Sequence, residues 1–132
     1  MNKDKITFAK ISGYDAVIAA AVHADVHVVH RVGALEEADV VALCDDLVTL
    51  GCTGRHNLVL DLSAVTHIDY RGFDRLAACA KFLRQAGGEL KICGLSEYHR
   101  VLFRASGRYG DFEYFDSPDA AAADFALEAS LV

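Results

Sequence analysis

Side chains capable of chemistry gather in the middle of the sequence, between residues 61 and 73. Asp61 and Asp69 supply two carboxylates, and Tyr70 and Arg71 directly follow the second one. A carboxylate pair could act as general acid and base, but this spacing does not require it, and an Asp at a helix start is typically a cap. Tyr and Arg are over-represented among residues that anchor protein interfaces. The stretch favours protein recognition over catalysis, although a solvated Arg and a packed loop Tyr would explain it equally well.

Six histidines and four cysteines raise the question of a metal site. His23, His27 and His30 are close in sequence, but on a strand His30 would point away from the other two. The cysteines form no C-x-x-C pair and lie among apolar neighbours, unlike zinc ligands. They are Cys44, Cys52, Cys79 and Cys93. We expect no metal and no cofactor, and we expect at least three of the cysteines to be small reduced core residues.

Alternating strand and helix patterns surround this central stretch. Strands are expected over residues 5–11, 26–32, 57–63, 89–95 and 112–115. Helices are expected over residues 36–50, 72–86, 96–105 and 118–129. Residues 14–25 could form a strand or a short helix. The order predicts an α/β fold with a mostly parallel or mixed sheet of about four to six strands and about four helices packed on it.

Length and composition restrict the function further. The 132 residues, 53% hydrophobic with one proline, suit a single domain with one core. The net charge of −6 argues against nucleic acid as a partner. No apolar run approaches the roughly 20 residues that span a bilayer, and no signal-peptide pattern is visible. We expect a cytoplasmic protein without direct membrane insertion. No Ser-His-Asp arrangement, P-loop or G-x-G-x-x-G occurs, so we expect no enzyme.

Residues 57–76, NLVLDLSAVTHIDYRGFDRL, carry a family motif. They resemble the core of the STAS family (sulfate transporter and anti-sigma factor antagonist), in which a strand ending L-D-L-S precedes V-T-x-I-D-S-S-G. The positions in register are Leu60, Asp61, Leu62, Ser63, Val65, Thr66, Ile68, Asp69 and Gly72. The resemblance covers about residues 26–125, and residues 1–25 fit poorly. It implies one STAS-like domain over 1–132.

The resemblance also implies a regulatory function. Many small bacterial members are anti-sigma factor antagonists, and a kinase-type anti-sigma factor phosphorylates the second serine of D-S-S-G. In this sequence Tyr70 and Arg71 replace the two serines, so the usual acceptor is missing and Thr66 is the alternative. We predict a non-enzymatic interaction module in signal transduction and transcription regulation. Its partner would be a kinase-type anti-sigma factor or a signalling scaffold. The predicted partner-binding loop consists of His67, Asp69, Tyr70, Arg71, Gly72 and Phe73.

Three alternatives remain open on the sequence alone. STAS domains also serve transporters, so the chain could be an accessory subunit of a membrane transporter, including a lipid transporter. The helix start at the motif could bind an anion, with Arg71 assisting, which would suit a nucleotide or other small-molecule sensor. Residues 26–32 could be an edge strand that pairs with a second copy and forms a homodimer.

Overall fold

The computed structural model describes residues 26–54 and 57–130, with side chains through residue 128. Its elements are β1 (Val26–Leu35), α2 (Glu37–Cys52), β2 (Asn57–Ile68), α3 (Arg71–Gln85), β3 (Glu89–Cys93), α4 (Glu97–Ser106), η3 (Tyr109–Asp111), β4 (Glu113–Phe115) and α5 (Pro118–Ser130). The expected strand over 5–11, the segment 14–25 and His23 lie outside the described residues.

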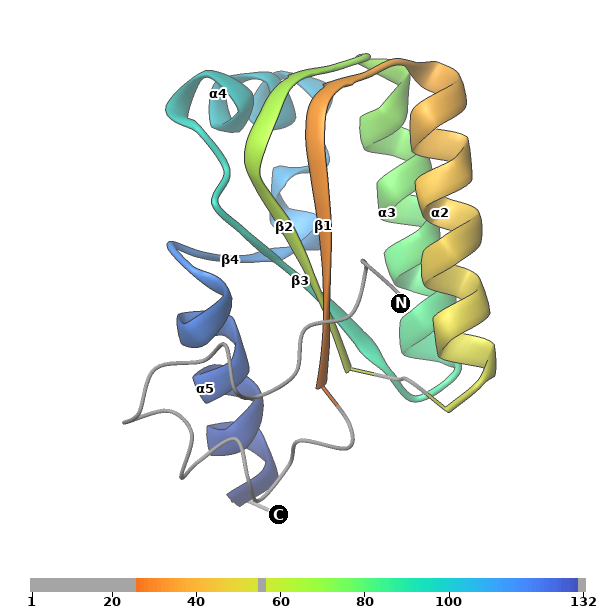
Figure 1. Cartoon of the computed structure of the whole chain (residues 1–132), viewed down its shortest axis with the longest axis vertical. Coiled ribbons are helices and arrows are strands. Elements are labelled where there is room, and N and C mark those ends of the chain that lie inside the picture. The colour runs from red at the N-terminus through yellow and green to blue at the C-terminus, as the bar shows by residue number, and fades with distance from the viewer. Residues whose placement is uncertain (1–25, 55–56, 131–132) are drawn as a thin grey trace.

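The described strands form one parallel sheet in the order β1-β2-β3-β4. Each connection passes through a helix, which brings the carboxyl ends of all strands to one end of the sheet. Figure 1 shows α2 and α3 together on one side of the sheet, α5 on the other, and α4 near the carboxyl ends of the strands. The α/β prediction is confirmed. Within the described residues, β1 forms one edge of the sheet.

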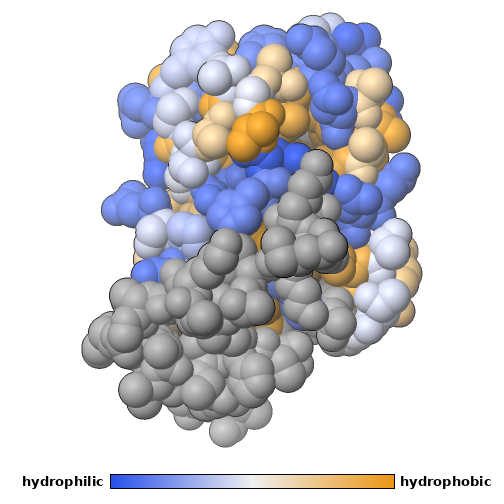
Figure 2. All heavy atoms as spheres, viewed as in Figure 1, coloured by the Kyte–Doolittle hydropathy of each residue, from blue (hydrophilic) through white to orange (hydrophobic). Residues whose placement is uncertain are grey.

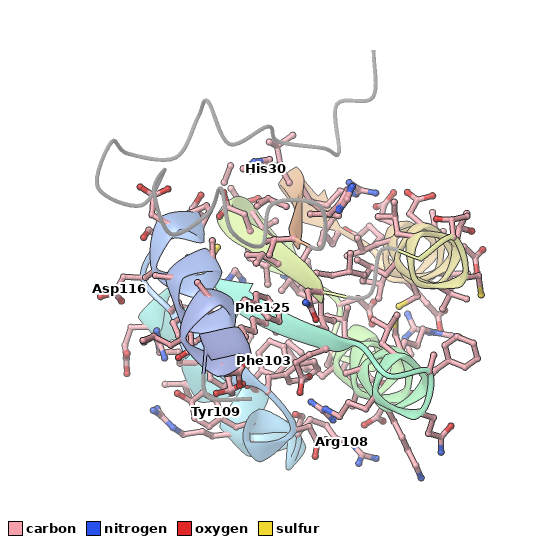
Figure 3. The ribbon with its side chains drawn as sticks, turned by 90° about the horizontal axis from the view of Figure 1, so that it is seen from below. His30, Phe103, Arg108, Tyr109, Asp116 and Phe125 are labelled. Carbon is pink, nitrogen blue, oxygen red and sulfur yellow. The ribbon has the colours of Figure 1, made fainter. Side chains whose placement is uncertain are left out.

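Buried side chains form two clusters, one on each side of the sheet. The larger includes Leu43 of α2, Leu76 of α3 and Phe103 of α4. The smaller includes Val59 of β2 and Phe125 of α5. Figure 3 looks along the molecule from below and shows Phe125 between α5 and the strands. A strand such as β2, which packs helices on both faces, therefore has a continuous apolar sequence.

Two serine side chains and a glycine mark the ends of α4 and α5. The hydroxyl of Ser96 accepts a hydrogen bond from the backbone N–H of His99 at 3.1 Å, and Ser117 does the same for Ala120 at 3.1 Å. Gly107 ends α4 with a φ of 80°, a left-handed conformation that glycine adopts without strain. These contacts fix where α4 and α5 begin.

Strand β2 is longer than the expected 57–63, and that prediction is wrong. It continues to Ile68 because β1 also continues, to Leu35, and the two strands stay paired there. Only residues 57–61 pair with β3 as well. The end of β2 is therefore paired on one side only, and Thr66 lies on this part of the strand. The extension carries the motif to the end of the molecule where α2 and α3 begin.

Lys91 of β3 is enclosed between the sheet and the C-terminal part of the chain. Its side chain is 0% exposed, and its Nζ lies 2.6 Å from Asp124, 2.9 Å from Glu113 and 3.1 Å from Glu128. The ammonium also lies 4.5 Å from the centre of the Phe125 ring. Burial by itself lowers the pKa of Lys91, but hydrogen bonds to the three carboxylates outweigh it and raise the pKa. The cluster fastens α5 to the sheet.

Candidate functional site

The predicted loop lies between β2 and α3, at the carboxyl end of the sheet. The backbone N–H of Asp69 donates to the carbonyl of Leu35 at 2.8 Å, which holds the loop against the end of β1. Gly72 is buried, and a Cβ placed there would lie 2.8 Å from Val40 of α2 and 3.3 Å from Ile68. The glycine thus lets α3 start in direct contact with α2, and these contacts fix the loop's position.

The Arg71 guanidinium forms a bidentate ion pair with the Asp69 carboxylate. Its Nε and Nη2 each lie 3.0 Å from one carboxylate oxygen of Asp69, and its backbone N–H donates to Oδ1 at 3.0 Å. The side-chain hydrogen bond, followed by the backbone bond, lowers the pKa of Asp69 to about 2. Asp69 thus stands in front of the helix N-terminus as expected of a cap, although the residue immediately before α3 is Tyr70.

A second carboxylate extends this pair to α2. Arg71 Nη1 lies 3.3 Å from Glu37, whose other oxygen lies 3.0 Å from Arg75. Interactions with Asp69, then with Glu37, raise the pKa of Arg71. All four side chains are at least partly exposed, so water and salt weaken their attraction. We infer that the network orients the loop rather than stabilising the fold.

The other predicted loop residues divide into exposed and buried ones. Tyr70 is 76% exposed, which excludes the packed loop Tyr considered from the sequence. Thr66 and His67 are exposed on β2. Phe73, by contrast, is 1% exposed and its ring centre lies 4.3 Å from that of Phe103. Phe73, like Gly72, therefore supports the loop from beneath and offers no surface to a partner in this conformation.

Helix α4 adds residues that the sequence did not indicate. A groove of about 320 Å³ separates α4 from the start of α3, and its apolar lining includes Tyr70, Leu102 and Ala105. Nearby on α4, Tyr98 and Val101 are 60% and 53% exposed. Val101 at an exposed position of the expected helix was the one feature of the sequence that could have indicated this surface. Figure 2, drawn from the same side as Figure 1, shows hydrophobic atoms in separate small groups among hydrophilic ones.

The remaining titratable candidates have structural partners. Asp61 is buried, its Oδ2 lies 2.8 Å from His30 Nδ1, and its Oδ1 accepts from the backbone N–H of Ser63 at 3.0 Å. Asp61 and Asp69 therefore pair with different basic residues. His27 is buried and His30 half-buried on the opposite face of β1, as the strand period predicts. In the described part of the chain, these histidines build no shared metal site.

One acidic group has the spacing of a metal site: Glu113, Asp124 and Glu128. Lys91 Nζ lies within 3.1 Å of all three, however, so the lysine already supplies the positive charge. Among the cysteines, Cys79 and Cys93 are buried and Cys44 is half-buried against the core, which agrees with the expectation. Cys52 is exposed, and all four thiols are free. No helix among the described residues is long and apolar enough to span a membrane.

Comparison with known proteins gives one family. The model of the STAS domain family matches residues 15–121. BtrV of Bordetella bronchiseptica, provisionally named an anti-sigma factor antagonist, is 34% identical over 93 residues, which cover 70% of this chain and 80% of BtrV.

Solved structures share the fold. The anti-sigma factor antagonist SpoIIAA in its unphosphorylated form has a TM-score of 0.61 at 15% identity, covering 78% of this chain and 90% of SpoIIAA. The phosphorylated form of the Bacillus protein gives 0.58 at 16% identity, covering 80% and 91%. The STAS domain of a SulP transporter from Vibrio cholerae gives 0.59 at 15% identity, covering 89% and 99%. Together with the family match and the identity to BtrV, these likenesses lead to one conclusion: the chain belongs to the STAS domain family.

Proposed function

We propose that this chain is a non-enzymatic regulatory module that acts by binding a protein, in the manner of an anti-sigma factor antagonist. The observation that carries the proposal is the motif loop, where an exposed Tyr70 stands beside the Arg71–Asp69 pair. An exposed aromatic ring next to an oriented guanidinium suits an interface anchor. The name of BtrV supports the same class of function. We place the module in the cytoplasm, where such a partner would be met.

We also propose that phosphorylation at position 71, where the family motif has its acceptor serine, does not switch partner binding on or off. SpoIIAA has been solved both unphosphorylated and phosphorylated, and the family motif places the acceptor serine where this chain has Arg71. A guanidinium offers no hydroxyl, and Asp69 already accepts the backbone N–H that begins α3. Regulation would then act elsewhere, with the exposed Thr66 as the alternative acceptor.

The proposed contact surface is smaller than the predicted loop. It consists of His67, Asp69, Tyr70 and Arg71, with Gly72 and Phe73 holding these residues in place. The groove beside α4 would extend it. The engagement of Arg71 by Asp69 and Glu37 speaks against the nucleotide-sensor alternative, because the cation and the helix N-terminus already have an anion. The likeness to the SulP domain concerns the fold and favours no transporter role over regulation.

The binding test compares variants of the loop with a matched control. Affinity purification from the source cell would identify the partner, and calorimetry would measure its affinity for the wild type, Tyr70→Ala, Arg71→Asp and Arg104→Ala. Arg104 is an exposed arginine of α4 outside the loop. We expect each loop variant to lose about tenfold or more in affinity, as for interface anchors, and Arg104→Ala to bind normally.

The phosphorylation test uses the same partner. If it is a kinase-type anti-sigma factor, we expect no phosphate transfer to position 71 of the wild type and transfer to Arg71→Ser, which restores the hydroxyl. Phosphate on the wild-type loop would contradict constitutive binding. Recovery of transporter subunits in place of a regulatory kinase or scaffold would replace the regulatory proposal with the accessory one.

A further inference from the structure

Helices α2 and α3 lie side by side (Figure 1) and approach closely at two glycines. A Cβ on Gly72 would lie 2.8 Å from Val40, and one on Gly51 would lie 2.5 Å from Leu83. Each glycine thus leaves room for a side chain of the facing helix. Small residues occupy the stretch between these contacts, and two of them are cysteines.

Cys44 of α2 and Cys79 of α3 face each other in this stretch. Cys79 Sγ lies 3.9 Å from the backbone carbonyl of Cys44 and donates to it. Both line a surface groove of about 330 Å³, with Arg75 at its edge and the exposed ring of Phe82 beside it. Cys44 is half-buried and open to this groove, whereas Cys79 is 5% exposed.

The two thiols have opposite acid–base character. Interaction with the Cys79 side chain lowers the pKa of Cys44, against the effect of burial and with help from the charge of Arg75. The same interaction, then burial, raises the pKa of Cys79. Because the thiolate is the nucleophile, Cys44 is the sulfur that would attack and Cys79 the one that keeps its proton.

We propose that Cys44 and Cys79 form a reactive dithiol that hydroperoxides oxidise to a disulfide between α2 and α3. Cys44 sulfur attacks one peroxide oxygen: an S–O bond forms, the O–O bond breaks, and the leaving oxygen takes up the proton that Cys44 had released to water. Cys79 sulfur then attacks Cys44 sulfur. An S–S bond forms, the S–O bond breaks, and the departing hydroxide takes the Cys79 proton to leave as water. The two thiols lose two electrons, which the peroxide gains.

The other two cysteines serve as internal references. Cys52 is exposed near the end of α2, so its oxidation shows how fast an accessible thiol without a partner cysteine reacts. Cys93 is 0% exposed, and burial, followed by the charge of Asp61, raises its pKa. The dithiol therefore predicts a linked pair rather than the oxidation of whichever thiol is most accessible.

The experiment is peptide mapping of the full chain after brief treatment with hydrogen peroxide and alkylation of the remaining thiols. Trypsin and Asp-N together place each cysteine in its own peptide: residues 39–44, 46–55, 76–81 and 92–100. We expect a linked species of 39–44 and 76–81 with the loss of two hydrogen atoms. Cys52→Ser should form it equally. Cys79→Ser should lose it and leave a sulfenic acid on Cys44 that dimedone traps.

Two outcomes would overturn the proposal, and both come from the wild type, so they do not depend on a variant folding. One is that Cys44 and Cys79 stay fully alkylatable while Cys52 is oxidised. The other is that the linked species joins Cys44 or Cys79 to a cysteine outside the pair. Neither result depends on the proposed binding function.

Discussion

Arg71 and Lys91 are both cations surrounded by carboxylates, in opposite surroundings. The Arg71 side chain is 52% exposed and bonds Asp69 and Glu37 at the entrance of α3. Lys91 is 0% exposed and bonds three carboxylates from β4 and α5. At 4 Å, two charges attract by about 1 kcal/mol in water and by several times more near a protein interior. The same chemistry therefore orients the loop between β2 and α3 in one place and holds the fold together in the other.

The largest expected effect is at Lys91. Lys91→Ala leaves a void in the sheet and three carboxylates without their cation, so we expect a loss of about 3–5 kcal/mol in the free energy of unfolding. Urea denaturation followed by circular dichroism measures it. The control Lys81→Ala, on the exposed side of α3, should change stability by less than about 0.5 kcal/mol. If Lys91→Ala lowers the free energy of unfolding no more than Lys81→Ala does, the contrast drawn between Lys91 and Arg71 is wrong.

An intermediate effect is expected at Gly72, beneath the loop. Gly72→Ala places a methyl group 2.8 Å from Val40, and overpacking of this kind costs about 1–3 kcal/mol. The same urea titration applies. Gly110→Ala is the matched control, because a Cβ there meets no atom within 4 Å. If both variants unfold alike, packing does not position the start of α3.

The smallest effect on stability is expected at Arg71. Arg71→Ala should change the free energy of unfolding little, as for exposed ion pairs, while the pKa of Asp69 should rise from about 2 toward its ordinary 3.8. Because the native pKa is lowered, the contribution of Asp69 is present above pH 3.8 and is lost as the pH falls toward 2. NMR titration of the Asp69 carboxyl measures its pKa in the wild type and in the variant, and urea denaturation measures the change in stability. An unchanged pKa in the variant would show that Arg71 does not hold this carboxylate.

The sequence predicted elements whose apolar period was regular. In α3, Phe73, Leu76, Ala80 and Leu83 share one helical face, and all four are buried. The end of β2 was missed because beyond Asp61 only β1 pairs with the strand, so its burial follows no simple period. Phe73 was predicted as part of the partner-binding loop, but it lies on this face of α3 and is buried in the core.

The sequence could not reveal sites built from distant segments. Lys91 interrupts the apolar strand ELKICGL and gives no sign of enclosure, because its partners come from β4 and α5. The groove beside Tyr70 needs α4, whose position depends on the folded sheet. The missing motif serine, in contrast, was evident in the sequence because it concerns residue type alone.

The residues of the Lys91 cluster are synthesised in a fixed order. Lys91 leaves the ribosome well before Glu113, Asp124 and Glu128, so β3 emerges with its lysine still lacking these counter-charges. Enclosing an ammonium without its partners is strongly unfavourable. The sheet can therefore close over Lys91 only after α5 has been synthesised, so α5 is the helix that completes the enclosure of Lys91.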